Sequence, residues 1–419
     1  MVFQNLFPFA LGSGFAKASI ISLLFYLLSF IVGYTQIRIR SREINNCEMT
    51  YMYEYPQFVR ISLPPNITTN YRRYGLYAYA EGRFIDKARQ MKFDGIPVLF
   101  IPGHSGSYKQ VRSLASVSLR KSLGSRTPYH FDFFTIDLNE EYSGLFGGVL
   151  KDQTRFILHA IQHIFSLYKK NEPDSIVLFG HSMGGVLAKG LFLEPDFMKN
   201  RVRLLITLAT PHSPVVLLDK MSAYYYQSIR MNWPSEDMDS LTMISVGGGS
   251  RDLPVSSALT VAKEADINIL STGVSGAWVN TDHLAILWCK QLVIVLIRAI
   301  FDSVDLKSLQ ISKDKELVKK IFQYHLVDRS AGKQYSTSQH PSKIVFWNSK
   351  SHPGDWIEPL NKQMSIEKPF GVNRATYYML RIVEQNKHQI LSISAYNHKG
   401  RDWIFACNAN SVFDNMRLW

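Results

Sequence analysis

The chain has 419 residues, of which 46% are hydrophobic and 19% charged, a composition typical of a folded protein and unlike a disordered one. Its formal net charge is +13, but the sequence has no long Lys/Arg blocks and no nucleic-acid-binding signature. The charge therefore favours an anionic membrane surface over nucleic acid. The three cysteines, Cys47, Cys289 and Cys407, exclude a disulfide scaffold and a four-cysteine zinc site, and we expect neither a metal nor a cofactor.

One disulfide remains possible, and whether Cys47 pairs with Cys407 is left open. Cys289 lies in a largely apolar stretch and is most simply interpreted as a buried small hydrophobic residue.

Residues 18–37 read ASIISLLFYLLSFIVGYTQI and carry no charge. This is the length that crosses a bilayer as a helix, and it exceeds the ~7–15-residue apolar core of a signal peptide. A clear small-x-small cleavage site is lacking as well, so we expect an uncleaved membrane anchor in residues 1–45. The Arg-rich flank at 38–42 indicates a cytosolic location for the following domain. The sequon Asn66-Ile67-Thr68, a candidate glycosylation site, indicates the lumen instead.

From residue 96 onward, short apolar runs alternate with helical patterns, after a tyrosine-dense segment (47–94) that we interpret as a packing layer. Strands are expected at 97–101, 130–136, 175–179, 203–208 and 241–246, and helices at 110–121, 151–169, 186–193 and 282–301. This alternation predicts an α/β fold of the α/β-hydrolase type, a mostly parallel sheet covered by helices on both faces. Such sheets hold their ligand sites at the carboxyl ends of the strands.

The pattern decays into polar, Lys- and Ser-rich sequence around residues 305–339. Beyond it, strand-like pieces at 344–347, 376–383 and 389–396 predict a β-rich accessory module. We therefore divide the chain into a membrane anchor (1–45), an α/β-hydrolase catalytic domain (46–305), a linker (306–341) and a β-rich module (342–419) interpreted as incomplete.

Ser182 lies in Gly180-His181-Ser182-Met183-Gly184-Gly185, between an expected strand and an expected helix. This is the G-x-S-x-G nucleophile elbow, a crowded turn that needs glycines on both sides of the serine. It exposes the serine oxygen at a helix N-terminus, where developing negative charge is favoured. We therefore predict that Ser182 is the nucleophile of a serine hydrolase and that His181 is a packing residue.

The acid and the base should follow the serine in the order Asp or Glu, then His. His283 immediately precedes the last helix and is predicted to be the base, whereas His212 comes too early in the chain. Asp252 follows the fifth strand and is predicted to be the acid, with Asp219, after the fourth strand, as the alternative. Asp282 is treated as structural, because neighbours in sequence rarely face each other.

The tetrahedral intermediate of ester hydrolysis needs an oxyanion hole of two backbone N–H groups. One is expected from Met183, the residue after the nucleophile, and the other from His104, in the loop after the first strand of the core. Residues 221–239 are interpreted either as an amphipathic cap over this site or as a packed surface helix.

Together, several stretches resemble the GPI inositol-deacylases of the endoplasmic reticulum. They are CEMTYMYEYP (47–56), GIPVLFIPGHSGSYKQVRS (95–113), the elbow, ATPH (209–212) and TDHL (281–284). The second stretch is the most specific. The resemblance covers residues 46–305 strongly and the tail weakly, and the family's serine matches Ser182.

The resemblance implies a lipase-like serine esterase that removes the acyl chain from the inositol of GPI-anchored proteins in the endoplasmic reticulum, supporting their export and quality control. The implied substrate is the acylated GPI lipid at the membrane. Catalysis in the lumen places the Arg-rich flank there, against the positive-inside count. Members of this family are considerably longer and carry further membrane spans. The alternatives are another membrane-associated lipase or esterase of this fold, and a catalytically inert hydrolase-fold binding protein.

Overall fold

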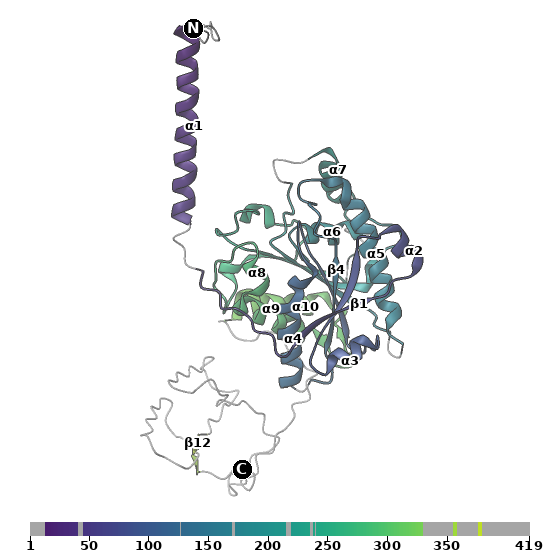
Figure 1. The fold of residues 1–419 in the computed structure, drawn as a ribbon. Helices are drawn as coiled ribbons and strands as arrows, with labels where there is room; N and C mark the ends of the chain where they lie inside the picture. The colour runs from purple at the N-terminus through teal and green to yellow at the C-terminus, as the bar shows by residue number, and fades with distance from the viewer. Residues whose placement is uncertain are drawn as a thin grey trace, which may run out of the picture. The chain divides into compact units, whose positions relative to one another are not determined.

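The computed structural model describes residues 13–40, 45–125, 127–169, 172–214, 219–234, 238, 240–329, 355–357 and 376–378. The chain divides into two compact units, Met1–Thr337 and Ser338–Trp419. The first unit contains an N-terminal helix and a large α/β domain (Figure 1).

The N-terminal helix α1 (Ser13–Arg40) contains the apolar stretch Lys17–Ile37, with a mean hydropathy of 1.9. These 21 residues are long and apolar enough to cross a membrane, and none of the stretch is buried within the protein. An apolar N-terminal helix is therefore present where the sequence predicts one.

The α/β domain is built on an eight-stranded sheet with the order β1-β2-β4-β3-β5-β6-β7-β8. The strands are β1 (Pro56–Ile61), β2 (Gly75–Glu81), β3 (Ile96–Ile101), β4 (Phe131–Asp137), β5 (Ile176–His181), β6 (Val202–Leu208), β7 (Thr242–Gly247) and β8 (Ile267–Leu270). β2 pairs antiparallel with both β1 and β4, and the strands from β4 to β8 pair in parallel. This mostly parallel sheet confirms the predicted α/β-hydrolase fold.

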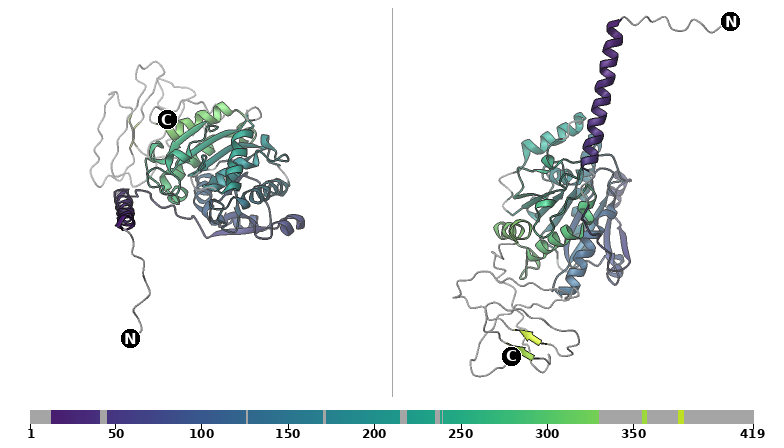
Figure 2. Two further views of the ribbon diagram at one scale, coloured as in Figure 1. Left: turned by 90° about the horizontal axis from the view of Figure 1, so that it is seen from above. Right: turned by 90° about the vertical axis from the view of Figure 1, so that its left-hand side faces the viewer.

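Helices cover both faces of the sheet (Figures 1 and 2). One group comprises α5 (Leu150–Leu167), α6 (Met183–Leu191) and α7 (Lys220–Asn232), and the other comprises α4 (Arg112–Ser125), α8 (Ala285–Trp288), α9 (Lys290–Asp302) and α10 (Lys315–Gln323). Two short helices, α2 (Pro65–Asn70) and α3 (Phe84–Arg89), flank β2, and a small hairpin pairs β9 (Val304–Asp305) with β10 (Gln310–Ile311).

Alternate residues of each central strand serve two separate hydrophobic cores. In β3, Leu99 and Ile101 belong to the core that also contains residues of α5 and α6. Val98 and Phe100 belong to the core that also contains residues of α4 and α9. All four side chains are fully buried, which explains why this strand reads as a continuous apolar run rather than as an alternating one.

The structure departs from the sequence prediction before the parallel core. The segment predicted to be a packing layer also forms β1 and β2, which extend the sheet by an antiparallel pair. β8 was also not expected. The helix predicted at 282–301 is divided into α8 and α9 at Cys289, where the backbone is extended.

Cys289 is buried, but the expectation that it is simply a small hydrophobic residue is wrong, because it forms a disulfide with Cys47. The two cysteines lie 242 residues apart in sequence. Backbone contacts bring them together: the Lys290 N–H donates to Glu48 O at 2.8 Å, and Met49 forms an isolated antiparallel bridge with Cys289.

In the second unit, the described residues form the parallel pair β11 (Asp355–Ile357) and β12 (Thr376–Tyr378). β12 lies in the strand expected at 376–383, while those expected at 344–347 and 389–396 lie outside the described residues. The β-rich module and the domain boundaries stay predictions.

Candidate active site

Ser182 occupies a strained turn between β5 and α6. Its backbone has φ 52° and ψ −127°, a left-handed conformation that costs energy for a residue with a side chain. The turn is held by two hydrogen bonds: the Ser182 N–H donates to Leu208 O at 2.9 Å, and the Gly185 N–H donates to Ser182 O at 3.1 Å. This is the geometry of a nucleophile elbow.

The glycines around the serine leave no room for side chains. A Cβ atom at Gly180 would lie 2.4 Å from the Cα of Gly185. One at Gly184 would lie 2.1 Å from Ile101 O, and one at Gly185 would lie 2.1 Å from Thr210 Oγ1. The start of α6 therefore packs directly against the backbone of β3 and β5, with its positive N-terminal end at the elbow.

His283 and Asp252 lie side by side although they come from different loops. The Nδ1 atom of His283 lies 3.0 Å from Oδ1 and 3.1 Å from Oδ2 of Asp252. The Asp252 side chain is fully buried in the loop after β7, where Oδ1 also accepts the Val255 N–H at 2.9 Å. A carboxylate at Nδ1 orients an imidazole and favours the tautomer whose Nε2 can accept a proton.

The alternative acid, Asp219, is engaged elsewhere. It is the N-cap of α7, where Oδ1 accepts the Ser222 N–H and Oδ2 accepts the Gly147 N–H, both at 2.7 Å. These backbone donors lower the pKa of the Asp219 carboxyl. Among the hydrogen bonds of the described residues, the His283 ring is joined to Asp252 and not to Asp219.

Asp282 has a structural role at the start of α8. Its Oδ1 atom accepts the N–H groups of Leu284 at 3.0 Å and Ala285 at 2.7 Å, which ties down the segment immediately after His283.

The loop that carries His104 touches the elbow. A Cβ atom at Gly103 would lie 2.6 Å from Ser182 Cβ and 2.9 Å from the backbone nitrogen of Met183. Met183 is the first residue of α6, so its N–H has no acceptor within the helix. The segments expected to supply the two oxyanion donors are therefore in contact. The Nδ1 atom of His104 accepts the Gly144 N–H at 3.1 Å, and burial together with His283 lowers the pKa of His104.

The sequence did not predict a further contact between the elbow and His283. The Nε2 atom of His181 lies 2.8 Å from the carbonyl oxygen of His283, and the two ring centroids are 4.8 Å apart. Burial and the neighbouring His283 lower the pKa of His181 to about 3, so its ring is neutral and donates from Nε2. The signal for this contact in the sequence is the adjacency of His181 to Ser182, from which only a packing role is predicted.

The segment 221–239, predicted to be a cap or a packed surface helix, contains all of α7 except its first residue, Lys220. This helix packs against the elbow. The Tyr226 hydroxyl donates to Pro211 O at 3.0 Å and lies 3.6 Å from Met183 Sδ. On the same helix, Tyr224 and Met231 are exposed. Whether α7 caps a substrate stays a prediction. His212 is half-buried, with Nε2 3.0 Å from Thr207 Oγ1.

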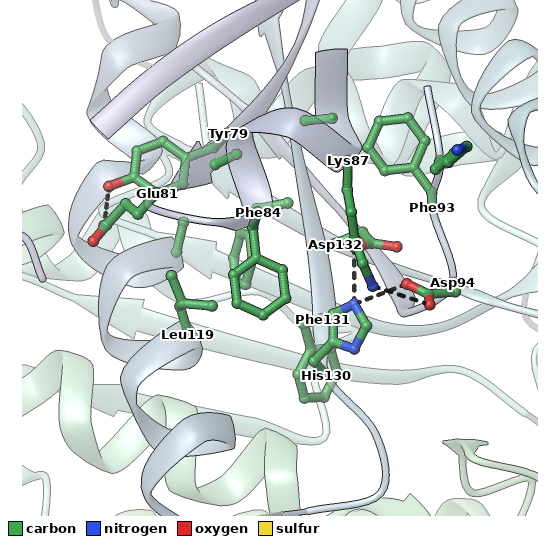
Figure 3. Close-up of a pocket in the computed structure, with 15 residues that line it drawn as sticks. Tyr79, Glu81, Phe84, Lys87, Phe93, Asp94, Leu119, His130, Phe131 and Asp132 are labelled. Carbon is green, nitrogen blue, oxygen red and sulfur yellow. Dashed lines mark hydrogen bonds and ion pairs between the residues drawn. The ribbon is translucent and has the colours of Figure 1, made fainter. Parts of the chain in front are cut away.

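A pocket lies near the amino ends of β3 and β4, at the end of the parallel strands opposite to the elbow. Figure 3 shows the residues that line it. The pocket contains His130, whose Nε2 atom lies 3.3 Å from Asp132 Oδ1 and 3.4 Å from Asp94 Oδ1. The described residues that line this pocket include no serine, threonine or cysteine, whereas the elbow carries Ser182.

Comparisons with known proteins place the chain in a family. The family model described as "PGAP1-like alpha/beta domain" matches residues 92–303. A GPI inositol-deacylase of Mus musculus is 41% identical over 311 residues, covering 72% of this chain and 33% of that protein. Its counterpart in Xenopus laevis is 35% identical over 386 residues, covering 88% of this chain and 40% of that protein. The chain thus spans between a third and two-fifths of the length of these relatives.

Among solved structures, an S-formylglutathione hydrolase from Staphylococcus aureus is similar with a TM-score of 0.36 and 12% sequence identity. The similarity covers 60% of this chain and 98% of that one.

Proposed function

Because the chain belongs to the family of the PGAP1-like alpha/beta domain, we propose that it is a serine esterase that removes the inositol-linked acyl chain from GPI-anchored proteins. The substrate follows from the relatives' shared name, GPI inositol-deacylase. The observation that carries the proposed chemistry is the pairing of His283 with the buried Asp252, on a segment that also contacts the elbow of Ser182.

In the proposed reaction, Ser182 Oγ attacks the ester carbonyl while His283 Nε2 takes its proton. Asp252 stabilises the resulting imidazolium through Nδ1–H, and the N–H groups of Met183 and His104 stabilise the oxyanion. The imidazolium then protonates the leaving inositol oxygen, which frees the inositol and leaves an acyl-serine. Water, activated by the same histidine, hydrolyses the acyl-serine and regenerates the enzyme.

We further propose that α1 anchors the protein in the membrane of the endoplasmic reticulum and that the α/β domain lies in the lumen, where the acylated GPI lipid is its substrate. The Cys47–Cys289 disulfide supports this side of the membrane, because such bonds persist in oxidising compartments. Asn66 is exposed on α2 and accessible to glycosylation. Both features follow α1 in the chain, so both support the same orientation.

A fluorophosphonate probe tests the proposed chemistry. The full chain in detergent should be labelled, whereas Ser182→Ala should not be, and Asp219→Asn should be labelled like the wild type. Equal labelling of the wild type and Ser182→Ala would contradict the nucleophile. Absence of labelling in both would favour a hydrolase-fold binding protein.

The substrate needs a separate test. Expressed in cells that lack inositol deacylation, the chain should restore the release of GPI-anchored proteins by phosphatidylinositol-specific phospholipase C, and Ser182→Ala should not. Probe labelling without this rescue would favour another membrane-associated esterase. Mobility shifts on deglycosylation, compared between the wild type and Asn66→Gln, test the luminal orientation.

A further inference from the structure

We propose that His181 is a positioning residue that holds the base, His283, in register with the nucleophile through the backbone carbonyl of His283. The inference rests on the proposed function, because it takes Ser182 and His283 as the reacting pair.

The geometry gives His283 two separate fixed points. Its Nδ1 atom is paired with Asp252, from the loop after β7, and its carbonyl oxygen accepts the Nε2–H of His181, from the elbow itself. The first contact orients the ring. The second fixes the backbone from which the ring projects, and it originates one residue from Ser182. A single bond therefore couples the elbow to the loop that carries the base.

The surroundings of His181 keep this bond in one protonation state. The residue is 2% exposed, and a carbonyl oxygen can only accept, so the proton must reside on Nε2. Among the described residues, the buried Nδ1 atom has no hydrogen-bond partner. Burial and the neighbouring His283 lower the pKa of His181 to about 3, so the side chain remains neutral at physiological pH.

Neutrality matters because the His283 ring becomes cationic during acyl transfer. The ring centroids of the two histidines are 4.8 Å apart, close enough for a second positive charge to oppose the imidazolium. A neutral imidazole supplies the donor that the carbonyl needs without this repulsion.

Two substitutions separate positioning from packing. His181→Phe keeps a ring of similar shape but removes the donor, which leaves the carbonyl of His283 without this partner. His181→Gln loses the ring but retains a neutral side chain whose NH₂ group can donate to the carbonyl. A packing role predicts that phenylalanine is the better replacement, whereas positioning predicts that glutamine is.

The test measures the rate of fluorophosphonate labelling against probe concentration, using the full chain in detergent. We expect His181→Phe to lower the maximal labelling rate on the order of 10–100-fold, because small displacements of a base are costly. The half-saturating probe concentration should stay unchanged, and His181→Gln should recover most of the rate. The labelled fraction at completion identifies misfolding, and His181→Met replaces His181→Phe if the latter does not fold.

Equal maximal rates for wild type and His181→Phe, or a slower His181→Gln than His181→Phe, would overturn the inference. If Ser182→Ala is not labelled while either of these results is obtained for the His181 variants, the inference about His181 fails but the proposed function stands. Labelling of Ser182→Ala at the wild-type rate would instead remove the proposed function itself.

Discussion

The two ends of the parallel sheet each hold a histidine beside carboxylates, yet they are built differently. At the carboxyl end, His283 faces the single carboxylate of Asp252, next to a neutral His181 and a strained serine. At the amino end, His130 lies between Asp132 and Asp94 (Figure 3). Burial there lowers the pKa of His130, but the hydrogen bond to Asp132 and the charges of both carboxylates outweigh it and raise the pKa.

At the amino end, Asp132 makes hydrogen bonds that join neighbouring segments of the fold. Asp132 Oδ2 accepts the Gly95 N–H at 2.8 Å and the Tyr168 hydroxyl at 3.0 Å, which joins the start of β3 to the segment after α5. A histidine and a carboxylate therefore do not make an active site by themselves. In the proposed mechanism, the reactive group and the charge stabilisation come from the elbow and the neighbouring backbone donors, both at the carboxyl end.

The largest expected effect comes from replacing Asp252, at the carboxyl end, and Asp132, at the amino end, in separate variants. Asp252→Asn should lower turnover on the order of 10⁴-fold, because the amide no longer favours the reactive tautomer of His283. Asp132→Asn should leave turnover unchanged but weaken a buried hydrogen-bond network, costing about 1.5–3 kcal/mol of the free energy of unfolding. Ester turnover and chemical denaturation of both variants check this pair. A large loss of turnover in Asp132→Asn would break the comparison.

The sequence was sufficient for the parallel strands β3 to β7, though not for β8, because buried parallel strands are continuous apolar runs, as in β3 and β5. It was insufficient for β1 and β2, where tyrosines and charged residues give no clear run. Tyr79, for example, packs its ring edge-on against Phe58 across these two strands and bonds its hydroxyl to Glu81. Such cross-strand contacts can be predicted only when the partner strand is known.

In the candidate site, too, the sequence predicted some features and not others. Chain order sufficed to nominate Ser182, Asp252 and His283, and the structure brings the last two into contact. The bond from His181 to the His283 backbone and the Cys47–Cys289 disulfide each join segments more than a hundred residues apart. Local pattern carries no information on which distant loops meet, so neither contact could be predicted.

The next largest effect concerns the crosslink that lies six residues after His283, at the junction of α8 and α9. Replacing both Cys47 and Cys289 with serine should reduce the free energy of unfolding by about 2–5 kcal/mol, because the bond closes a long loop. Cys407→Ser is the matched control and should not change the stability. Thermal unfolding of the full chain in detergent measures both. Equal stability of the double variant and the control would mean that the crosslink does not stabilise the fold.

The pH dependence of stability should distinguish the two ends of the sheet by its sign. His181 has a pKa of about 3 in the folded protein and ~6.5 when unfolded. The unfolded state therefore binds more protons as the pH falls below ~6.5, and the His181 site costs up to about 1.4 kcal/mol per pH unit. His130 has a raised pKa, so its contribution is complete below ~6.5 and is lost as the pH rises through its folded pKa.

Chemical denaturation of His181→Gln and His130→Gln between pH 5 and 8 tests these signs. The destabilisation caused by His181→Gln should shrink towards pH 5, whereas that caused by His130→Gln should shrink towards pH 8. Parallel pH curves for the two variants would show that the two histidines do not differ in the predicted way.

The smallest expected effect concerns Asp219, a carboxylate at the same end of the sheet as Asp252 but bonded, among the described residues, to Gly147 and Ser222. Asp219→Ala removes the N-cap of α7 and should lower the melting temperature by roughly 2–4 °C. Asp219→Asn keeps a capping side chain and should shift it less. Both variants should retain turnover, because the Nδ1 atom of His283 remains paired with Asp252. A loss of turnover in Asp219→Asn comparable to that of Asp252→Asn would make Asp219 the acid and reverse the assignment.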